Sequence, residues 1–217
     1  MKLKTIARTI KTLGKGVTMG IDPAVDASDP FELFQEWFAD AEGSGLVHPE
    51  AMALATASPE GAPSVRIVLL KELDDAGFVF YTNHESRKGG ELLANPKASV
   101  VFHWASLERQ VRVEGVVEPV SREQATVYFH SRPRGSQIGA WASRQSRDLA
   151  ARTDLEARVQ EFTQKFEGGD VPLPDFWGGF RIRPARIEFW QGRTSRLHDR
   201  LVFEATDYGW VTRRLYP

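Results

Sequence analysis

The stretch VRIVLLKELDDAGFVFYTNHESRK, residues 65–88, decides the fold. Two runs rich in β-branched and aromatic residues flank an Asp/Gly turn, so the stretch is predicted to form a β-hairpin. The second run ends in the polar residues Tyr81, Thr82 and Asn83. Ser86 then stands where it could cap a helix that extends to about Ala94.

The first turn of this predicted helix is basic. Arg87 and Lys88 stand against the helix dipole, which favours anions at a helix start. Free backbone N–H groups, the Ser86 hydroxyl and two cations together suit a phosphate group. The alternative is an ordinary solvated helix start, and this stretch alone does not separate the two interpretations.

The composition is that of an ordinary globular chain of 217 residues, with 28 Lys and Arg against 29 Asp and Glu. This charge balance argues against a nucleic-acid binder that depends on backbone electrostatics. No apolar run approaches the ~18 residues of a membrane span. Cysteine is absent, which excludes disulfides, thiolate metal sites and thiol nucleophiles and leads us to expect a cytoplasmic protein.

Other common chemistries have little support in the sequence. The 5 His residues are scattered and none stands at a metal-ligand spacing from another, so no metal site is expected. The strained Gly-x-Ser-x-Gly elbow of a hydrolase is absent. A dinucleotide fold is not expected either, because no Gly-x-Gly-x-x-Gly follows a predicted strand.

Residues 1–28 are predicted to form a separate basic arm. Several Lys and Arg residues precede the first acidic residue, Asp22, and apolar residues recur at helical spacing among them. An arm that docks on its own protein is the favoured interpretation, and binding to a membrane surface is the alternative. The remainder, residues 29–217, is expected to form one domain.

Strands dominate the rest of the chain, with helices inserted between them. Besides the hairpin, strands are predicted at 52–57, 98–104, 110–120, 180–182, 185–191, 201–204 and 210–214, and helices near 30–41, 121–130, 137–143 and 153–166. Short turns join most of these elements. The pattern predicts a mainly β, α+β fold: a closed or nearly closed antiparallel barrel with helices packed outside.

Three polar clusters are candidates for carrying chemistry. The first cluster comprises Arg66, Lys71, Tyr81, Thr82, Ser86, Arg87 and Lys88; the second Tyr128, Arg132, Arg134, Ser136 and Gln137; the third Trp190, Gln191, Arg193, Arg196, His198 and Arg200. Each mixes cations with hydroxyls or amides, which suits phosphate. Two phosphate sites would imply a phosphorylated cofactor and a phosphorylated substrate. Structural salt bridges, such as one between Asp199 and a neighbouring Arg, are the alternative.

These residues stand in motifs that can be compared with known families. The motifs are RIVLLK (66–71), FYTN (80–83), SRK (86–88), ERQVRVEG (108–115), SRPR (131–134), SQIGAW (136–141), QS (145–146), EFWQ (188–191), RLHDR (196–200) and RLYP (214–217). In order and with few gaps, they resemble the pyridoxine/pyridoxamine 5′-phosphate oxidase family. The resemblance runs from about Asp29 to Pro217.

The resemblance implies an FMN-binding split β-barrel, antiparallel and Greek-key-like, that works as a homodimer with FMN between the subunits. A C-terminal dimerisation region is part of the domain. The implied reaction oxidises pyridoxine 5′-phosphate or pyridoxamine 5′-phosphate to pyridoxal 5′-phosphate, with O2 as the electron acceptor and H2O2 as product. The alternatives are a non-catalytic binder of FMN or pyridoxal phosphate, and another flavin reductase on the same barrel.

The resemblance also implies roles for individual residues. FMN is held by Arg66, Ile67, Val68, Leu69, Leu70, Lys71, Tyr81, Thr82, Ser86, Arg87 and Lys88 of one subunit, and by Gln110, Gln145, Ser146, Trp190 and Arg200 around the interface. The substrate phosphate is held by Lys71, Tyr128, Arg132 and Ser136. The implied catalytic residues, Arg196 and His198, lie against the pyridine ring of the substrate.

Two geometric expectations accompany these roles. Arg196 and His198 are two positions apart, so an extended chain points both side chains to one side. Arg66 and Lys71 have opposite parity, so the strand must end or bulge between them if both face the flavin. The segment 12–19 departs from the family, because it lacks the paired Arg and the Tyr with which the family closes over its substrate.

Overall fold

The structure, a computed structural model, describes residues 20–21 and 29–217, so all of the predicted basic arm except Gly20 and Ile21 lies outside the described residues. The strands are β1 (Ala51–Ala57), β2 (Pro63–Leu69), β3 (Glu72–Asp74), β4 (Gly77–Asn83), β5 (Lys97–Trp104), β6 (Arg109–Pro119), β7 (Trp177–Gln191), β8 (Asp199–Thr206) and β9 (Gly209–Arg214). The helices are α2 (Pro30–Gly43), α3 (Arg87–Ala94), α4 (Arg122–Ser131), α5 (Arg134–Ala142) and α6 (Arg152–Lys165).

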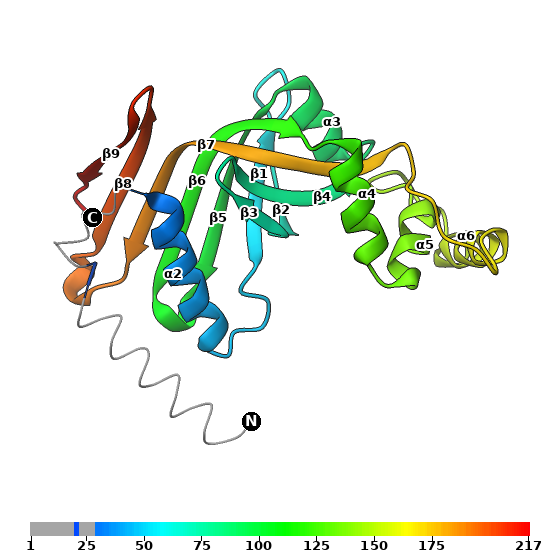
Figure 1. The fold of residues 1–217 in the computed structure, drawn as a ribbon, viewed down its shortest axis with the longest axis horizontal. Helices are drawn as coiled ribbons and strands as arrows, with labels where there is room; N and C mark the ends of the chain where they lie inside the picture. Colours follow the sequence, from blue (N-terminus) through cyan, green and yellow to red (C-terminus); the bar gives the residue numbers. More distant parts are fainter. Residues whose placement is uncertain (1–19, 22–28) are drawn as a thin grey trace.

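These strands form one antiparallel sheet that curls into a half-barrel, with helices packed on its outside (Figure 1). The strand order is β2-β1-β5-β6-β7-β4-β3, and β8 and β9 extend the sheet from β7. The predicted antiparallel, mainly β fold with packed helices is therefore confirmed.

The predicted hairpin has a different first strand from the one we expected. The turn lies where the sequence placed it: Asp74 faces Gly77, and the Asp74 carboxylate accepts hydrogen bonds from the N–H groups of Ala76 and Gly77 at 3.0 Å each. The strand paired with β4 across this turn is the short β3, whereas β2 pairs with β1. The pairing of residues 65–71 with 78–83 was therefore wrong.

The chain changes partners between two consecutive residues. The Leu70 N–H donates to the carbonyl of Glu50, which precedes β1, at 2.9 Å, and the Lys71 N–H donates to the carbonyl of Val79 in β4 at 2.8 Å. The first and last strands of the sheet order, β2 and β3, therefore approach each other here, which gives the sheet its barrel-like curl. The predicted interruption between Arg66 and Lys71 is this crossover, since β2 ends at Leu69.

Helix α2 closes one face of the sheet with aromatic side chains. The Asp29 carboxylate accepts from the Phe31 N–H at 2.8 Å and so begins the helix. The Phe34 ring lies 5.0 Å from the rings of Phe78 and Phe102, centroid to centroid, in edge-to-face contacts. This cluster anchors β4 and β5 and fixes the barrel wall that carries the candidate site.

Helices α4, α5 and α6 pack at one end of the sheet around a second apolar cluster (Figure 1). Phe129 of α4 and Trp177 at the start of β7 meet there in an edge-to-face contact of 5.2 Å. The helix predicted near 153–166 is α6, and its start differs by one residue from the expected one. The helix begins at Arg152, because the Asp154 carboxylate accepts from the Ala151 N–H at 3.2 Å.

Strand β7 crosses the whole molecule (Figure 1). The sequence predicted two strands here, but they form one, opposite a register shift between Glu114 and Gly115 of β6. A Cβ atom at Gly115 would lie 2.0 Å from the Arg183 carbonyl oxygen, so glycine is required where the strands come close. None of the helices in the described part of the chain is long and apolar enough to cross a membrane.

Candidate active site

The start of α3 confirms the predicted cap. The Ser86 hydroxyl accepts from the Gly89 N–H at 3.3 Å and donates to the Asn83 carbonyl at 2.6 Å. Ser86 is 1% exposed, so its side chain holds the helix start together. A Cβ atom at Gly89 would lie 2.2 Å from the carbonyl oxygen of His84, so the helix can pack this closely only with glycine there.

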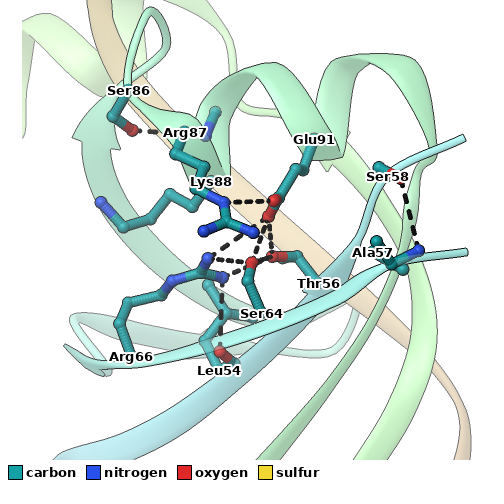
Figure 2. A network of polar contacts seen from close by, with 12 residues as sticks. Leu54, Thr56, Ala57, Ser58, Ser64, Arg66, Ser86, Arg87, Lys88 and Glu91 are labelled. Atoms are coloured by element: carbon teal, nitrogen blue, oxygen red, sulfur yellow. Dashed lines mark hydrogen bonds and ion pairs between the residues drawn. The ribbon is translucent and has the colours of Figure 1, made fainter. Parts of the chain in front are cut away.

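A buried carboxylate of α3, on the side of the helix that packs against β1 and β2, bonds to two predicted cofactor residues (Figure 2). Glu91 accepts from Nε of Arg87 at 2.9 Å and from Nη2 of Arg66 at 3.3 Å. The hydroxyls of Ser64 and Thr56 also donate to it. Burial acts to raise the pKa of Glu91, but these hydrogen bonds outweigh it and lower the pKa to about 2.

The first and second clusters meet in one cavity of about 350 Å³. It opens between β2, β4, α3 and α4. Its lining comprises Arg66, Ile67, Val68, Leu69, Lys71, Tyr81, Thr82, Asn83, Lys88, Tyr128, Arg132, Gln145 and Trp177. We call it the central cavity. Most of the residues that the resemblance assigned to FMN or to the substrate phosphate therefore face a single space.

The cations of the central cavity are partly desolvated. Lys88 donates to Oε1 of Gln145 at 2.8 Å and to the Thr82 hydroxyl at 3.1 Å. Burial, and then the charge of Arg66, hold the pKa of Lys88 below its ordinary value. Burial also lowers the pKa of Arg132, whose Nη1 atom is buried without a hydrogen-bond partner. An anion in the cavity would relieve both groups.

Three aromatic rings form one wall of the central cavity. Tyr81 stacks on Tyr128 at 3.9 Å between ring centroids, and Trp177 lies nearly parallel to both. The Arg132 guanidinium lies 4.7 Å from the Trp177 ring centroid. Burial, and then the hydrogen bond to Glu72, raise the pKa of Tyr81 strongly, so its hydroxyl stays protonated. The wall suits a flat ring bearing an anionic group.

The third cluster lies at the opposite end of β7. Trp190 is paired with Gln110 of β6 and with Arg200 of β8. Thirteen residues of extended strand separate it from Trp177, or roughly 40 Å. The buried Glu188 accepts from Nε of Arg200 at 2.8 Å, and Arg112 and Arg186 also donate to it. Within one chain these residues do not reach the central cavity.

Arg196 and His198 do not lie on an extended chain, and that geometric expectation was wrong. Residues Thr194–Arg196 form a 3₁₀ turn in which Ser195 and Arg196 have φ of 58° and 61°. Strand β8 begins only at Asp199. The His198 ring instead lies 4.5 Å from the Trp190 ring, and its Nδ1 accepts from the Arg193 N–H at 3.1 Å. The neutral ring therefore carries its proton on Nε2.

The base of the N-terminal arm reaches this same cluster. The Ile21 N–H donates to Asp199 at 3.1 Å, and Ile21 is buried in the core. Asp199 also pairs with Arg193 at 3.8 Å, so the predicted ion pair of Asp199 with a neighbouring Arg is present.

The remaining predicted residues do not line the central cavity. Ser136 stands in the first turn of α5, after the Arg132–Pro133 segment that links α4 to α5. Ser146 has φ of 68° in the exposed loop that follows Gln145. Glu72, Glu91 and Trp177 were missed in the sequence. Only the pair of Arg87 and Glu91 gave a signal, because its spacing of four residues is that of a helical ion pair.

The chain is similar to known proteins over most of its length. Residues 40–166 match the family model of pyridoxamine 5′-phosphate oxidase, and residues 177–217 match that of the pyridoxine 5′-phosphate oxidase C-terminal dimerisation region. A relative from Chelativorans sp., named pyridoxine/pyridoxamine 5′-phosphate oxidase, is 58% identical over 193 residues, 88% of this chain and 92% of its own. One of the same name from Psychromonas ingrahamii is 51% identical over 206 residues, 95% of each chain.

Solved structures share the fold. PhzG from Burkholderia lata, in complex with tetrahydrophenazine-1-carboxylic acid, has a TM-score of 0.87 and 32% identity, and covers 93% of this chain and 100% of its own. A pyridoxamine 5′-phosphate oxidase-related, FMN-binding protein from Nostoc punctiforme has a TM-score of 0.70 and 15% identity, over 87% of this chain and 98% of its own. The second likeness concerns the fold alone.

Proposed function

This chain belongs to the pyridoxamine 5′-phosphate oxidase family, and from that premise we propose that it oxidises pyridoxine 5′-phosphate or pyridoxamine 5′-phosphate to pyridoxal 5′-phosphate with FMN as cofactor. The central cavity carries the proposal. It joins two sets of cations and hydroxyls beside an aromatic wall, as a phosphorylated flavin and a phosphorylated ring would require.

The residues around α3 fit the phosphate end of FMN. Lys88 and Arg66 face the cavity, and among the described residues the partly desolvated Lys88 has only the neutral hydrogen-bond partners Thr82 and Gln145. Arg87 lies beside them in the first helical turn, where backbone N–H groups favour an anion. The bound FMN would supply the redox chemistry: acceptance of a hydride from the substrate carbon and transfer of the electrons to O2, giving H2O2.

The residues of α4 fit the substrate phosphate. Arg132 presents the buried, unpartnered Nη1, and Tyr128 stands beside it in the cavity wall. Lys71 lies across the cavity at the crossover from β2 to β3 and contributes a third contact. These groups hold the substrate by its phosphate and place its ring against the flavin. Ser136, close to Arg132 in the chain, completes the proposed set.

The third cluster completes the site from a second copy of the chain. Arg196, His198, Trp190, Gln110 and Arg200 stand far from the central cavity of their own chain, so a two-fold related copy would supply them. The match of residues 177–217 to a dimerisation region supports this arrangement. Arg196 and the Nε2–H of His198 would then fix the pyridine ring, and His198 would help to manage the substrate proton.

A second candidate function is oxidation of a substrate whose ring bears a carboxylate instead of a phosphate ester. The likeness to PhzG, which was solved with tetrahydrophenazine-1-carboxylic acid, favours it. Arg132 and Tyr128 discriminate, because they are the residues proposed to hold a phosphate, a group that tetrahydrophenazine-1-carboxylic acid does not have. A protein that only binds flavin, the third possibility, has no need of either residue.

Peroxide production tests these alternatives. The purified protein should be yellow, and it should produce H2O2 and pyridoxal 5′-phosphate in equal amounts when given pyridoxamine 5′-phosphate. Unphosphorylated pyridoxamine and tetrahydrophenazine-1-carboxylic acid serve as the matched substrates, and both should react far more slowly. A yellow protein that produces no peroxide would instead be a flavin binder, and turnover of the tricyclic acid alone would favour the second candidate.

A further inference from the structure

Glu91 stands behind the predicted flavin-phosphate site without belonging to it. It is 9% exposed, and four side chains from three elements converge on it: Thr56 of β1, Ser64 and Arg66 of β2, and Arg87 of α3 (Figure 2). Arg87 and Lys88 lie in the first turn of α3, the turn next to the predicted phosphate site. The carboxylate is thus placed to control the guanidinium groups without touching a ligand itself.

The hydrogen bonds divide between the two carboxylate oxygens. Oε1 accepts from Arg87, and Oε2 accepts from Thr56, Ser64 and Arg66. Arg66 is fixed further, because Nη1 donates to the Thr56 hydroxyl and to the Leu54 carbonyl. Arg87 uses only Nε on Glu91, so among the described residues its two terminal nitrogens have no hydrogen-bond partner.

The charges explain why a carboxylate is needed here. Arg66 and Lys88 line the central cavity, and Arg87 lies beside Lys88 in the first turn of α3. These three like charges repel one another before a ligand binds. One buried carboxylate shared by the two guanidiniums offsets this repulsion and fixes both orientations in advance. Sites arranged in this way bind more tightly, because the ligand need not order the side chains.

We infer that Glu91 is a positioning residue that sets the preference of the site for phosphorylated over unphosphorylated flavin. It acts by orienting Arg66 and Arg87 toward the phosphate. This inference rests on the proposed FMN site. A purely structural role for Glu91 would weaken binding of FMN and riboflavin alike, whereas the positioning role weakens only the binding of FMN.

Flavin titrations of the apo-protein separate the two roles. The dissociation constants of FMN and of riboflavin are measured by fluorescence quenching in the wild type, Glu91→Ala and Glu91→Gln. Glu156→Gln is the matched control, since Glu156 pairs with Arg152 in α6 at the same spacing of four residues and does not line the central cavity. We expect Glu91→Ala to lower FMN affinity about tenfold or more, the effect of one or two charged hydrogen bonds, with riboflavin affinity within about twofold of wild type.

The Gln variant should fall between these values, because its amide retains one acceptor oxygen but places a donor beside the arginines. An FMN-to-riboflavin preference in Glu91→Ala that equals or exceeds that of the wild type would overturn the inference. If Glu91→Ala does not fold, Ser64→Ala removes one donor and should lower the preference about threefold; no change there would also overturn it. A wild type that does not prefer FMN would instead contradict the proposed cofactor.

Discussion

The Tyr81 hydroxyl donates a hydrogen bond of 2.5 Å to Oε1 of Glu72, and the other oxygen of Glu72 accepts from Nε2 of Gln124 at 2.6 Å. One carboxylate thus joins β3, β4 and α4. Because the Tyr81 proton is engaged, its oxygen can only accept a hydrogen bond from a ligand. Tyr81 also stacks on Tyr128, so the position of α4 depends on the same contact.

Replacing Glu72 by Ala should therefore affect the substrate more than the flavin. The loss of two hydrogen bonds loosens α4, which carries Tyr128 and is followed directly by Arg132, and should raise KM for pyridoxamine 5′-phosphate about tenfold while FMN remains bound. Steady-state kinetics with separate kcat and KM provide the measurement. Gln124→Ala should act in the same direction with a smaller effect. Unchanged KM in both variants would show that Glu72 does not position α4.

Lys88 should make FMN binding sensitive to alkaline pH. Its pKa is lowered by burial and by Arg66, so the free protein loses this cation at a lower pH than an ordinary lysine. A bound phosphate dianion favours the protonated form, and FMN affinity should therefore fall as the pH rises through that pKa. Fluorescence titrations across neutral and alkaline pH measure the slope.

Lys88→Met is the matching variant. It should bind FMN about ten- to a hundredfold more weakly at neutral pH and lose that part of the pH dependence. Lys97→Met, which removes an exposed lysine from β5, is the control and should behave as the wild type. The same pH slope in Lys88→Met as in wild type would rule out Lys88 as its source.

Arg132→Ala should act mainly through substrate binding. A phosphate group is held similarly in the ground and transition states, so KM for pyridoxamine 5′-phosphate should rise about ten- to a hundredfold with little change in kcat. The apo-protein should lose little stability, because Nη1 has no hydrogen bond to lose. Kinetics and thermal unfolding together check both statements. An equal loss with unphosphorylated pyridoxamine would contradict the phosphate assignment.

Arg196 and His198 should control flavin reduction. A pyridine ring that is no longer fixed loses its reactive geometry, which costs about a hundredfold in rate. Stopped-flow reduction under anaerobic conditions isolates this step, and the variants Arg196→Ala and His198→Ala should remain yellow and dimeric. Wild-type reduction rates with normal binding in both would refute the assignment.

His198→Asn separates two contributions of this histidine. The amide oxygen can still accept from the Arg193 N–H, as Nδ1 does now, so the turn that carries Arg196 should be kept. What disappears is the Nε2–H. If His198→Asn reduces the flavin as slowly as His198→Ala, the loss of rate comes from the missing Nε2–H. If it reduces the flavin as fast as the wild type, the loss in His198→Ala comes from the turn that His198 supports.

The sequence predicted local features well and distant pairings less well. The turn at Asp74 and the cap at Ser86 depend on neighbouring residues, and both were confirmed. The partner of β2 was wrong, because a run of β-branched residues indicates a strand but not the strand beside it. The strand that does pair with β4 across the turn is β3. It has only three residues, too few for hydrophobic periodicity to detect.

The same limit applies to the candidate site. The first and second clusters were identified from residue types, and the structure brings most of them to one cavity. Glu91 and Glu72 escaped notice because most of their partners, such as Thr56, Ser64 and Gln124, lie far away in sequence. The expected geometry of Arg196 and His198 failed because two consecutive residues adopt a left-handed backbone, which the sequence Thr-Ser-Arg does not signal.

The length of β7, which separates the two halves of the proposed site within one chain, has a genetic consequence. If each site joins the α4 end of one copy to the third cluster of the other, an Arg132→Ala chain and an Arg196→Ala chain, each impaired on its own, can rescue each other. A mixed dimer contains one site with both defects and one with neither, so random reassociation of equal amounts should restore about a quarter of the sites. Two harmful alleles of this gene would then complement each other in a single cell.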